Sequence, residues 1–188
     1  VYKRQEKNMS LTRDNSKVQE AIFSSLFPKH PYGTQTVLGT QENLKNPSIT
    51  NIKNYYKQWY VPNNMAICMS GDLDPDATIA LIDKYFGGLK PNPELPKLDL
   101  PKEAPITQPV VKEVLGPDAE SVALAWRFPG VSDKDFEILQ VVSQVLYNGK
   151  AGLIDLDLNQ QQKVLNSYGY PMGLADYSAF ILGGLPKQ

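Results

Sequence analysis

The stretch most informative about the fold runs from His30-Pro31-Tyr32-Gly33 through Trp59-Tyr60-Val61-Pro62-Asn63-Asn64 to Gly71-Asp72. Proline fixes φ and glycine adopts conformations closed to other residues, so these places mark loops and corners. Between them, apolar residues at helical spacing predict helices, and an unbroken apolar run predicts a strand. The rest of the chain extends this alternation in both directions.

The composition is that of an ordinary globular chain, and it excludes several kinds of partner. Hydrophobic residues fill 41% of the 188 positions and charged residues 21%. The net charge of −1, with its basic residues scattered, argues against a nucleic-acid partner, because phosphate binding needs a clustered basic surface. No apolar run approaches the length of a membrane span. The single cysteine, Cys68, lies in an apolar run, where we expect a small buried hydrophobic residue.

A proline-rich stretch divides the chain. Residues 90–109 contain Pro91, Pro93, Pro96, Pro101, Pro105 and Pro109. Each proline removes a backbone donor, so neither a helix nor a central strand can run through. We therefore predict an extended linker over 90–109 between two packed units, 1–89 and 110–188.

Helical periodicity dominates residues 1–89. We expect Trp59 or Tyr60 to be buried at the corner where Pro62 forces the chain out of a helix. The predicted helices are one that contains Val18–Leu26 and ends before Pro28, one over 50–60, and one that begins at Asp74-Pro75 and ends at Gly87; the predicted strand is Met65–Ser70.

Strands and helices alternate in residues 110–188. The predicted strands are Val110–Val114, Val122–Phe128, Val164–Tyr170 and Tyr177–Leu182, and the predicted helices run from Ser132-Asp133 to Asn148-Gly149 and over Leu153–Leu158. We therefore predict two incomplete units of helices and strands joined by the proline-rich linker.

The residues form no self-sufficient catalytic group. His30 is the single histidine, and a lone histidine beside a proline is more often a turn or hydrogen-bonding residue than a metal ligand. With one histidine and one cysteine, the usual zinc ligand sets cannot be assembled. Phosphate-binding and dinucleotide-binding glycine motifs are absent from the sequence. We predict no catalytic residue within these 188 positions.

Several motifs occur in an order that is far more specific than any one of them. They are His30-Pro31-Tyr32-Gly33, Gly39-Thr40, Trp59-Tyr60-Val61-Pro62-Asn63-Asn64, Met65-Ala66-Ile67, Gly71-Asp72-Leu73-Asp74-Pro75, Lys84-Tyr85-Phe86-Gly87, Ala125-Trp126-Arg127-Phe128-Pro129-Gly130 and Gly149-Lys150-Ala151-Gly152-Leu153. In this order and spacing the chain closely resembles the pitrilysin/insulinase family of zinc metallopeptidases.

The resemblance implies an α+β fold, whose domains have an antiparallel-rich sheet with helices packed on one face. It also implies an inverted zinc motif, His-x-x-Glu-His, whose glutamate acts as general base on zinc-bound water. That motif would lie before Val1, so we expect this chain to be a piece of a longer protein. Residues 1–89 would be the C-terminal half of one family domain and 110–188 the N-terminal half of the next.

The family's third zinc ligand, a glutamate, would fall near the start of the chain. One register places it at Glu6, and another places Arg4 there, which cannot bind zinc. If Glu6 is the ligand, the chain is part of a zinc-dependent endopeptidase. If Arg4 occupies that position, the chain belongs to a non-catalytic family member that serves as a scaffold or chamber subunit for an active partner.

The resemblance also implies the cofactor, the partners and the compartment. Zinc would belong to the full-length parent if that parent is active, and we expect none bound to this chain alone. The expected partners are the remainder of the polypeptide or a homologous subunit, together with a peptide substrate. Strand edges and apolar faces separated from their complements would also favour self-association. A bacterial cell envelope or periplasm is the expected location.

Overall fold

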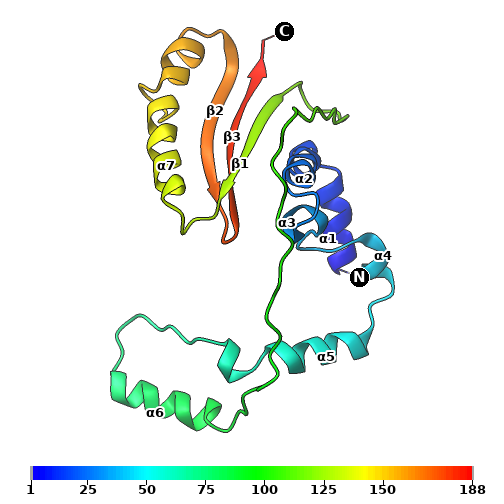
Figure 1. Cartoon of the computed structure of the whole chain (residues 1–188), viewed down its shortest axis with the longest axis vertical. Helices are drawn as coiled ribbons and strands as arrows, with labels where there is room; N and C mark the ends of the chain where they lie inside the picture. Colours follow the sequence, from blue (N-terminus) through cyan, green and yellow to red (C-terminus); the bar gives the residue numbers. More distant parts are fainter. Residues whose placement is uncertain (1, 188) are drawn as a thin grey trace. The chain divides into compact units, whose positions relative to one another are not determined.

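The computed structural model describes residues 2–187 and confirms the α+β fold (Figure 1). In chain order the elements are α1 (Tyr2–Leu11), α2 (Asp14–Leu26), α3 (Pro31–Thr34), α4 (Gln41–Lys45), α5 (Ile49–Trp59), η1 (Pro62–Asn64), α6 (Pro75–Phe86), β1 (Val122–Pro129), α7 (Lys134–Leu146), η2 (Asp155–Asn159), β2 (Val164–Gly173) and β3 (Tyr177–Pro186).

Local signals place the ends of two helices where the sequence predicts them. Asp74 caps α6 by accepting the Ala77 N–H at 2.9 Å, and Pro75 is the first helical residue. Asp133 caps α7 by accepting the Asp135 N–H at 3.0 Å. These ends are set by residues within three positions of the boundary, which is why they can be read from sequence.

The contacts divide the chain differently from the predicted 1–89 and 110–188. One unit combines residues 1–38 with 101–188, and the other is 39–100. The end of α2 packs against the sheet, so the first helices share a core with strands that lie far along the chain. Local periodicity carries no information about such a pairing. Whether 1–89 and 110–188 correspond to halves of two family domains stays a prediction.

The first unit contains a three-stranded antiparallel sheet in the order β1-β3-β2. The predicted strands Val164–Tyr170 and Tyr177–Leu182 are confirmed as β2 and β3, which pair as a hairpin with Gly173 opposite Ser178 beside the turn. The predicted strand Val122–Phe128 is confirmed as β1, which pairs with β3. Helix α7 packs along one face of this sheet, against β2 and β1 (Figure 1).

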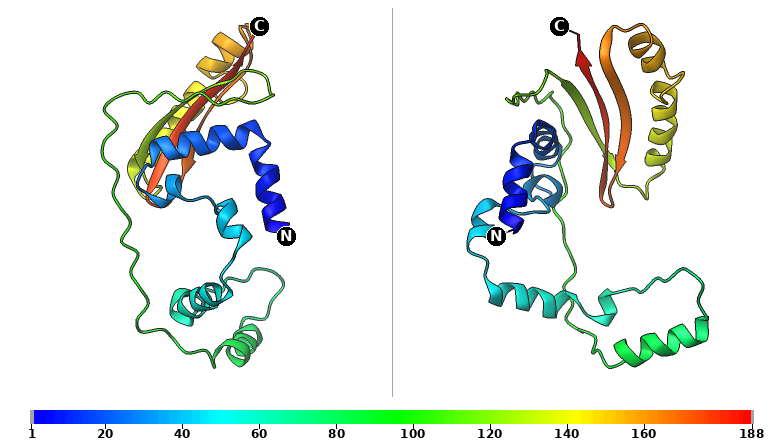
Figure 2. Two further views of the ribbon diagram at one scale, coloured as in Figure 1. Left: turned by 90° about the vertical axis from the view of Figure 1, so that its right-hand side faces the viewer. Right: turned by 180° about the vertical axis from the view of Figure 1, so that it is seen from behind.

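The core of this unit lies on the opposite face of the sheet, where the end of α2 packs (Figure 2). Leu26 and Phe27 contact Ala179 and Ile181, and all four side chains are buried. Phe27 is fully buried, and its ring centroid lies 5.6 Å from that of Tyr32, which it meets edge-on, and 5.6 Å from that of Tyr177, to which it is tilted. This aromatic cluster fixes the α2–α3 corner on the sheet.

The second unit, residues 39–100, buries little of its own surface. Within this range Val61 alone is buried, and the apolar faces predicted for α5 and α6 are exposed. The expected burial at the 59–62 corner is partial, because Trp59 is half-buried and Tyr60 is 55% exposed. Cys68 is exposed, so its expected burial is wrong in this structure.

Two predicted strands are not formed in the described residues. Residues 65–70 and 110–114 carry apolar runs, but neither forms a strand, because among the described residues nothing pairs with them. The short helix predicted over 153–158 is present, as α-helical residues 153–154 that continue into the π-helical segment η2. Among residues 2–187, no helix combines the length and the apolar character that a membrane crossing needs.

Candidate functional site

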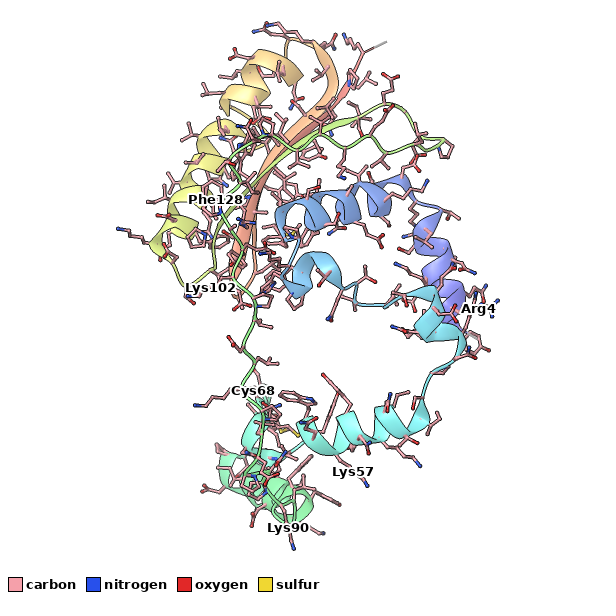
Figure 3. The ribbon with its side chains drawn as sticks, turned by 45° about the vertical axis from the view of Figure 1, so that its right-hand side comes forward. Arg4, Lys57, Cys68, Lys90, Lys102 and Phe128 are labelled. Carbon is pink, nitrogen blue, oxygen red and sulfur yellow. The ribbon has the colours of Figure 1, made fainter. Side chains whose placement is uncertain are left out.

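The two candidate ligand positions lie on α1, with Arg4 marked in Figure 3. The Glu6 side chain is 55% exposed, and its Oε2 accepts from Lys3 Nζ at 2.8 Å. The next residue, Lys7, is buried and holds α1 on α2 through an ion pair of 2.8 Å with Glu20. The docking of α1 therefore leaves the Glu6 carboxylate at the surface.

The described residues do not assemble a metal site around Glu6. No group of three or more histidine, cysteine, aspartate or glutamate side chains in the part of the chain that the structure describes could hold a metal ion. A lone exposed carboxylate supplies too few ligands for zinc. Glu6 as a zinc ligand stays a prediction about a larger protein.

His30 lies at the centre of the junction between the α2–α3 corner and the sheet. The ring is 1% exposed, and its Nδ1 caps α3 by accepting the Tyr32 N–H at 3.3 Å. The ring packs edge-on at 4.2 Å from Tyr32 and 5.3 Å from Tyr177. Its Nε2 has no hydrogen-bond partner and lies 3.6 Å from Oδ2 of Asp176.

Glu103 and Arg127 lock the same junction. Glu103 Oε1 accepts from the backbone N–H groups of Lys29 and His30, each at 2.7 Å. Its other oxygen faces Arg127 Nη1 at 3.9 Å, and the two side chains are only 2% and 10% exposed. Arg127 also donates to the carbonyl oxygens of Leu26 and Ala104. The Arg127 guanidinium thus binds the carbonyl end of α2, where the helix dipole is negative.

This network brings together motifs that are far apart in sequence. His30-Pro31-Tyr32-Gly33 meets Arg127 of Ala125-Trp126-Arg127-Phe128-Pro129-Gly130 through Glu103 and the Tyr177 ring. Sequence reasoning missed Glu103 and Asp176. A usable signal was Arg127, because a charged residue inside an alternating apolar strand needs a buried partner. The chemistry of this junction is structural: it fixes segments and presents no nucleophile or metal ligand set.

A second buried carboxylate organises the loop after α7. Asp155 is 4% exposed, and its Oδ2 accepts the N–H groups of Asn148 and Gly149 at 2.9 Å and of Gly152 at 3.2 Å. Burial works to raise the pKa of Asp155, but these hydrogen bonds and one from Asn159 outweigh burial and lower the pKa. The family-like segment 149–153 is therefore built around an ionised aspartate.

A third acidic group joins the segment that precedes β1 to α2. The hydrogen bond from Lys17 lowers the pKa of Asp14, and so does the backbone N–H of Asp118, which donates to Asp14 Oδ2 at 2.9 Å. Gly116 lies against the Asp14 carboxylate, where a Cβ atom would collide with it. Residues 115–118 are thus held on the first turn of α2.

Comparison with known proteins identifies the family. The family described as "Peptidase M16 inactive domain" matches residues 48–186. The zinc protease PqqE of Helicobacter pylori is 28% identical over 173 residues, which cover 88% of this chain and 38% of that protein. The probable mitochondrial-processing peptidase subunit beta of Schizosaccharomyces pombe is 29% identical over 85 residues, 45% of this chain and 18% of that protein.

Solved structures agree with this assignment. A protease from Helicobacter pylori superposes with a TM-score of 0.78 at 26% identity, over 99% of this chain and 46% of that one. Pitrilysin shares the fold, with a TM-score of 0.70 at 19% identity over 99% of this chain and 21% of that one. The chain spans less than half the length of these relatives. Because the family match covers most of its residues, this chain belongs to the M16 peptidases, the pitrilysin/insulinase family that its motifs predicted.

Proposed function

We propose that this chain is part of a zinc-dependent endopeptidase whose zinc motif lies outside these 188 residues. The observation that carries the proposal is the match to a zinc protease over 88% of the chain. In this function the chain supplies the corner between two family half-domains, held by Arg127, Glu103 and His30. Peptide hydrolysis would need the histidine pair and general base of the longer protein.

The Glu6 carboxylate is the group through which this chain would reach the metal. It lies on the exposed side of α1, while Lys7 on the other side anchors the helix to Glu20. Its partner Lys3 is 71% exposed, so their ion pair is a weak surface contact that a metal could replace.

The test uses the full-length protein that contains this chain. Glu6→Gln is expected to lower both the zinc content of the purified protein and its hydrolysis of unstructured peptides. Glu42→Gln is the matched control, because Glu42 also forms an exposed i,i+3 pair with a lysine, Lys45. Unchanged zinc content and activity in the Glu6→Gln variant would refute the role of Glu6.

The second candidate is a non-catalytic M16 subunit. It is favoured by the match to an inactive domain and by Arg4, which one register places at the ligand position. A full-length protein that holds no zinc, together with hydrolysis appearing only when a homologous subunit is added, would select this candidate over the first.

The proposed partners are the remainder of the polypeptide or a homologous subunit. Relatives are named as the subunit beta of a processing peptidase and as the first half of a periplasmic protease. Exposed apolar side chains on α5 and α6, including Ile52, Tyr56 and Ile79, support such a partner. For the isolated chain we propose self-association, which sedimentation at increasing concentration would detect; a monomer at all concentrations would refute it.

The proposed location is the bacterial cell envelope or periplasm. The support is the likeness to the periplasmic protease PqqL of Escherichia coli, which at 18% identity shows a shared fold. Fractionation of cells that express the full-length protein would test it, and recovery with the cytosolic fraction would contradict it.

A further inference from the structure

The pair Asn148-Gly149 ends α7 at an exposed turn, and neither function above uses it. An asparagine followed by glycine is chemically special. The glycine nitrogen can reach the asparagine side-chain carbonyl carbon, because no Cβ atom hinders its approach. The surrounding hydrogen bonds decide whether that reaction proceeds in the folded chain.

The Asn148 side chain is held in a way that favours attack on its Cγ atom. Its Oδ1 accepts from the backbone N–H groups of Lys150 at 3.0 Å and Ala151 at 2.9 Å. Two such donors would also stabilise the negative charge that forms on Oδ1 during attack. Its Nδ2, the leaving group, donates to the Gln144 carbonyl at 2.9 Å.

Asp155 opposes the same reaction by binding the N–H group of the nucleophile, Gly149. Its Oδ2 accepts from the Gly149 N–H at 2.9 Å, and its side chain is almost fully buried. Gly149 must lose this proton before its nitrogen can attack. The resulting amide anion would then lie beside the carboxylate of a buried side chain, and like charges at this distance repel. The lowered pKa of Asp155 makes its carboxylate a weak base for taking the proton.

We infer that Asn148 is a self-modification site at which the Gly149 nitrogen is the nucleophile. Asp155 suppresses this reaction while the loop is folded. In the reaction a bond forms between Gly149 N and Asn148 Cγ, and the bond from Cγ to Nδ2 breaks. The Gly149 proton and the amide leave as ammonia, and a succinimide remains. Water then opens either carbonyl of the ring to give aspartate or isoaspartate. The modified residue loses the Nδ2 donor to Gln144. Because the reaction is suppressed in the folded loop, the modification marks molecules in which this loop has unfolded.

The rate of this reaction in the whole chain tests the inference. Isoaspartate and aspartate at position 148 are measured by peptide mapping with mass spectrometry, in buffer and in urea. The reaction is expected to be slower in buffer by about tenfold or more. Asp155→Asn, in buffer, should recover most of the rate. Asp157→Asn is the matched control, because Asp157 is an exposed carboxylate of the same turn, and it should leave the rate unchanged.

Amide hydrogen exchange provides a second measurement that needs no variant. Base-catalysed exchange of the Gly149 N–H passes through the same amide anion, so it should be slowed by a similar factor. Exchange at the rate of an unstructured peptide would overturn the role of Asp155, even if Asp155→Asn fails to fold. Equal modification rates in buffer and in urea, or equal effects of the two aspartate variants in folded protein, would also overturn it.

Discussion

Gly33 lies so close to the end of α2 that a side chain has no room there. A Cβ atom would come within 2.5 Å of the Phe23 carbonyl oxygen and closer still to that of Phe27. Both contacts are with backbone atoms, which cannot rotate away as a side chain can. The His30-Pro31-Tyr32-Gly33 motif thus requires glycine for close approach of backbone segments.

Gly33→Ala is expected to destabilise the fold by about 1–3 kcal/mol, the usual cost of overpacking. Urea unfolding followed by circular dichroism would measure the change. Gly88→Ala is the control, because Gly88 has no atom within 4 Å of the position a Cβ would take. Equal stability of the two variants would show that the α2–α3 corner relaxes freely.

Asp155 makes the loop after α7 sensitive to acid. Its pKa is lowered in the folded state, so its carboxylate contributes stability above the unfolded pKa of about 3.9. That contribution falls as pH drops from there through the lowered folded pKa, because protonation removes the acceptor of the Asn148, Gly149 and Gly152 N–H groups.

The stability advantage of the native chain over Asp155→Asn should therefore be largest near neutral pH and shrink in acid. Unfolding midpoints in urea across this pH range would measure it. Asp14→Asn should behave in the same way, since the pKa of Asp14 is lowered by Lys17 and Asp118. A pH-independent difference for Asp155→Asn would contradict the assigned role of its charge.

At the scale of elements, β1 shows how a strand can cap a distant helix. Ala125 and Arg127 point to the same face of the sheet, where Ala125 joins the apolar core and Arg127 reaches the last carbonyl of α2. Glu103 neutralises this cation and accepts from the backbone N–H groups of Lys29 and His30, just beyond the helix. The pair is buried, so removing one partner leaves the other charge unpaired.

Arg127→Gln is expected to cost about 3–5 kcal/mol, the range for breaking a buried ion pair from one side. Glu103→Gln in the same chain should recover part of the loss, because the uncompensated charge is removed while an acceptor for Lys29 and His30 remains. Lys134→Gln, at the exposed start of α7, should change stability by less than about 0.5 kcal/mol. Additive effects of the Arg127 and Glu103 changes would show that the two side chains do not interact.

At the scale of the whole molecule, the chain leaves the first unit after residue 38 and returns at 101. The returning segment is held on the α2–α3 corner, because Glu103 binds the backbone of Lys29 and His30. The core residues Leu26, Phe27 and Ile181 all belong to this unit.

Replacing residues 39–100 with a short glycine-serine linker should therefore leave a cooperatively folded protein. Near-ultraviolet circular dichroism would follow the aromatic cluster around Phe27, and urea unfolding would report cooperativity. An unfolded product would show that residues 39–100 contribute to the stability of the first unit.

Some features of this protein are determined by short stretches of sequence alone. The caps Asp74 and Asp133, the hairpin at Gly173 and the helix ends each depend on residues a few positions apart. Hydrogen bonding and steric limits act at that range, so sequence reading placed these elements correctly. The ordered motifs also identified the family, because their spacing reflects one particular fold.

Other features were decided only by the tertiary structure. The apolar run at 65–70 has strand character, but a strand needs a neighbour, and none of the described residues provides one. The proline-rich boundary was expected to separate two packing units, yet Glu103 within it binds the α2–α3 corner and Ala104 accepts from Arg127. Likewise, the meeting of His30 with Tyr177 and Asp176 depends on contacts across more than a hundred positions. Such contacts form because burial of the Phe27 and Ile181 side chains is favourable. Periodicity along the chain does not indicate which distant segment a buried residue will contact.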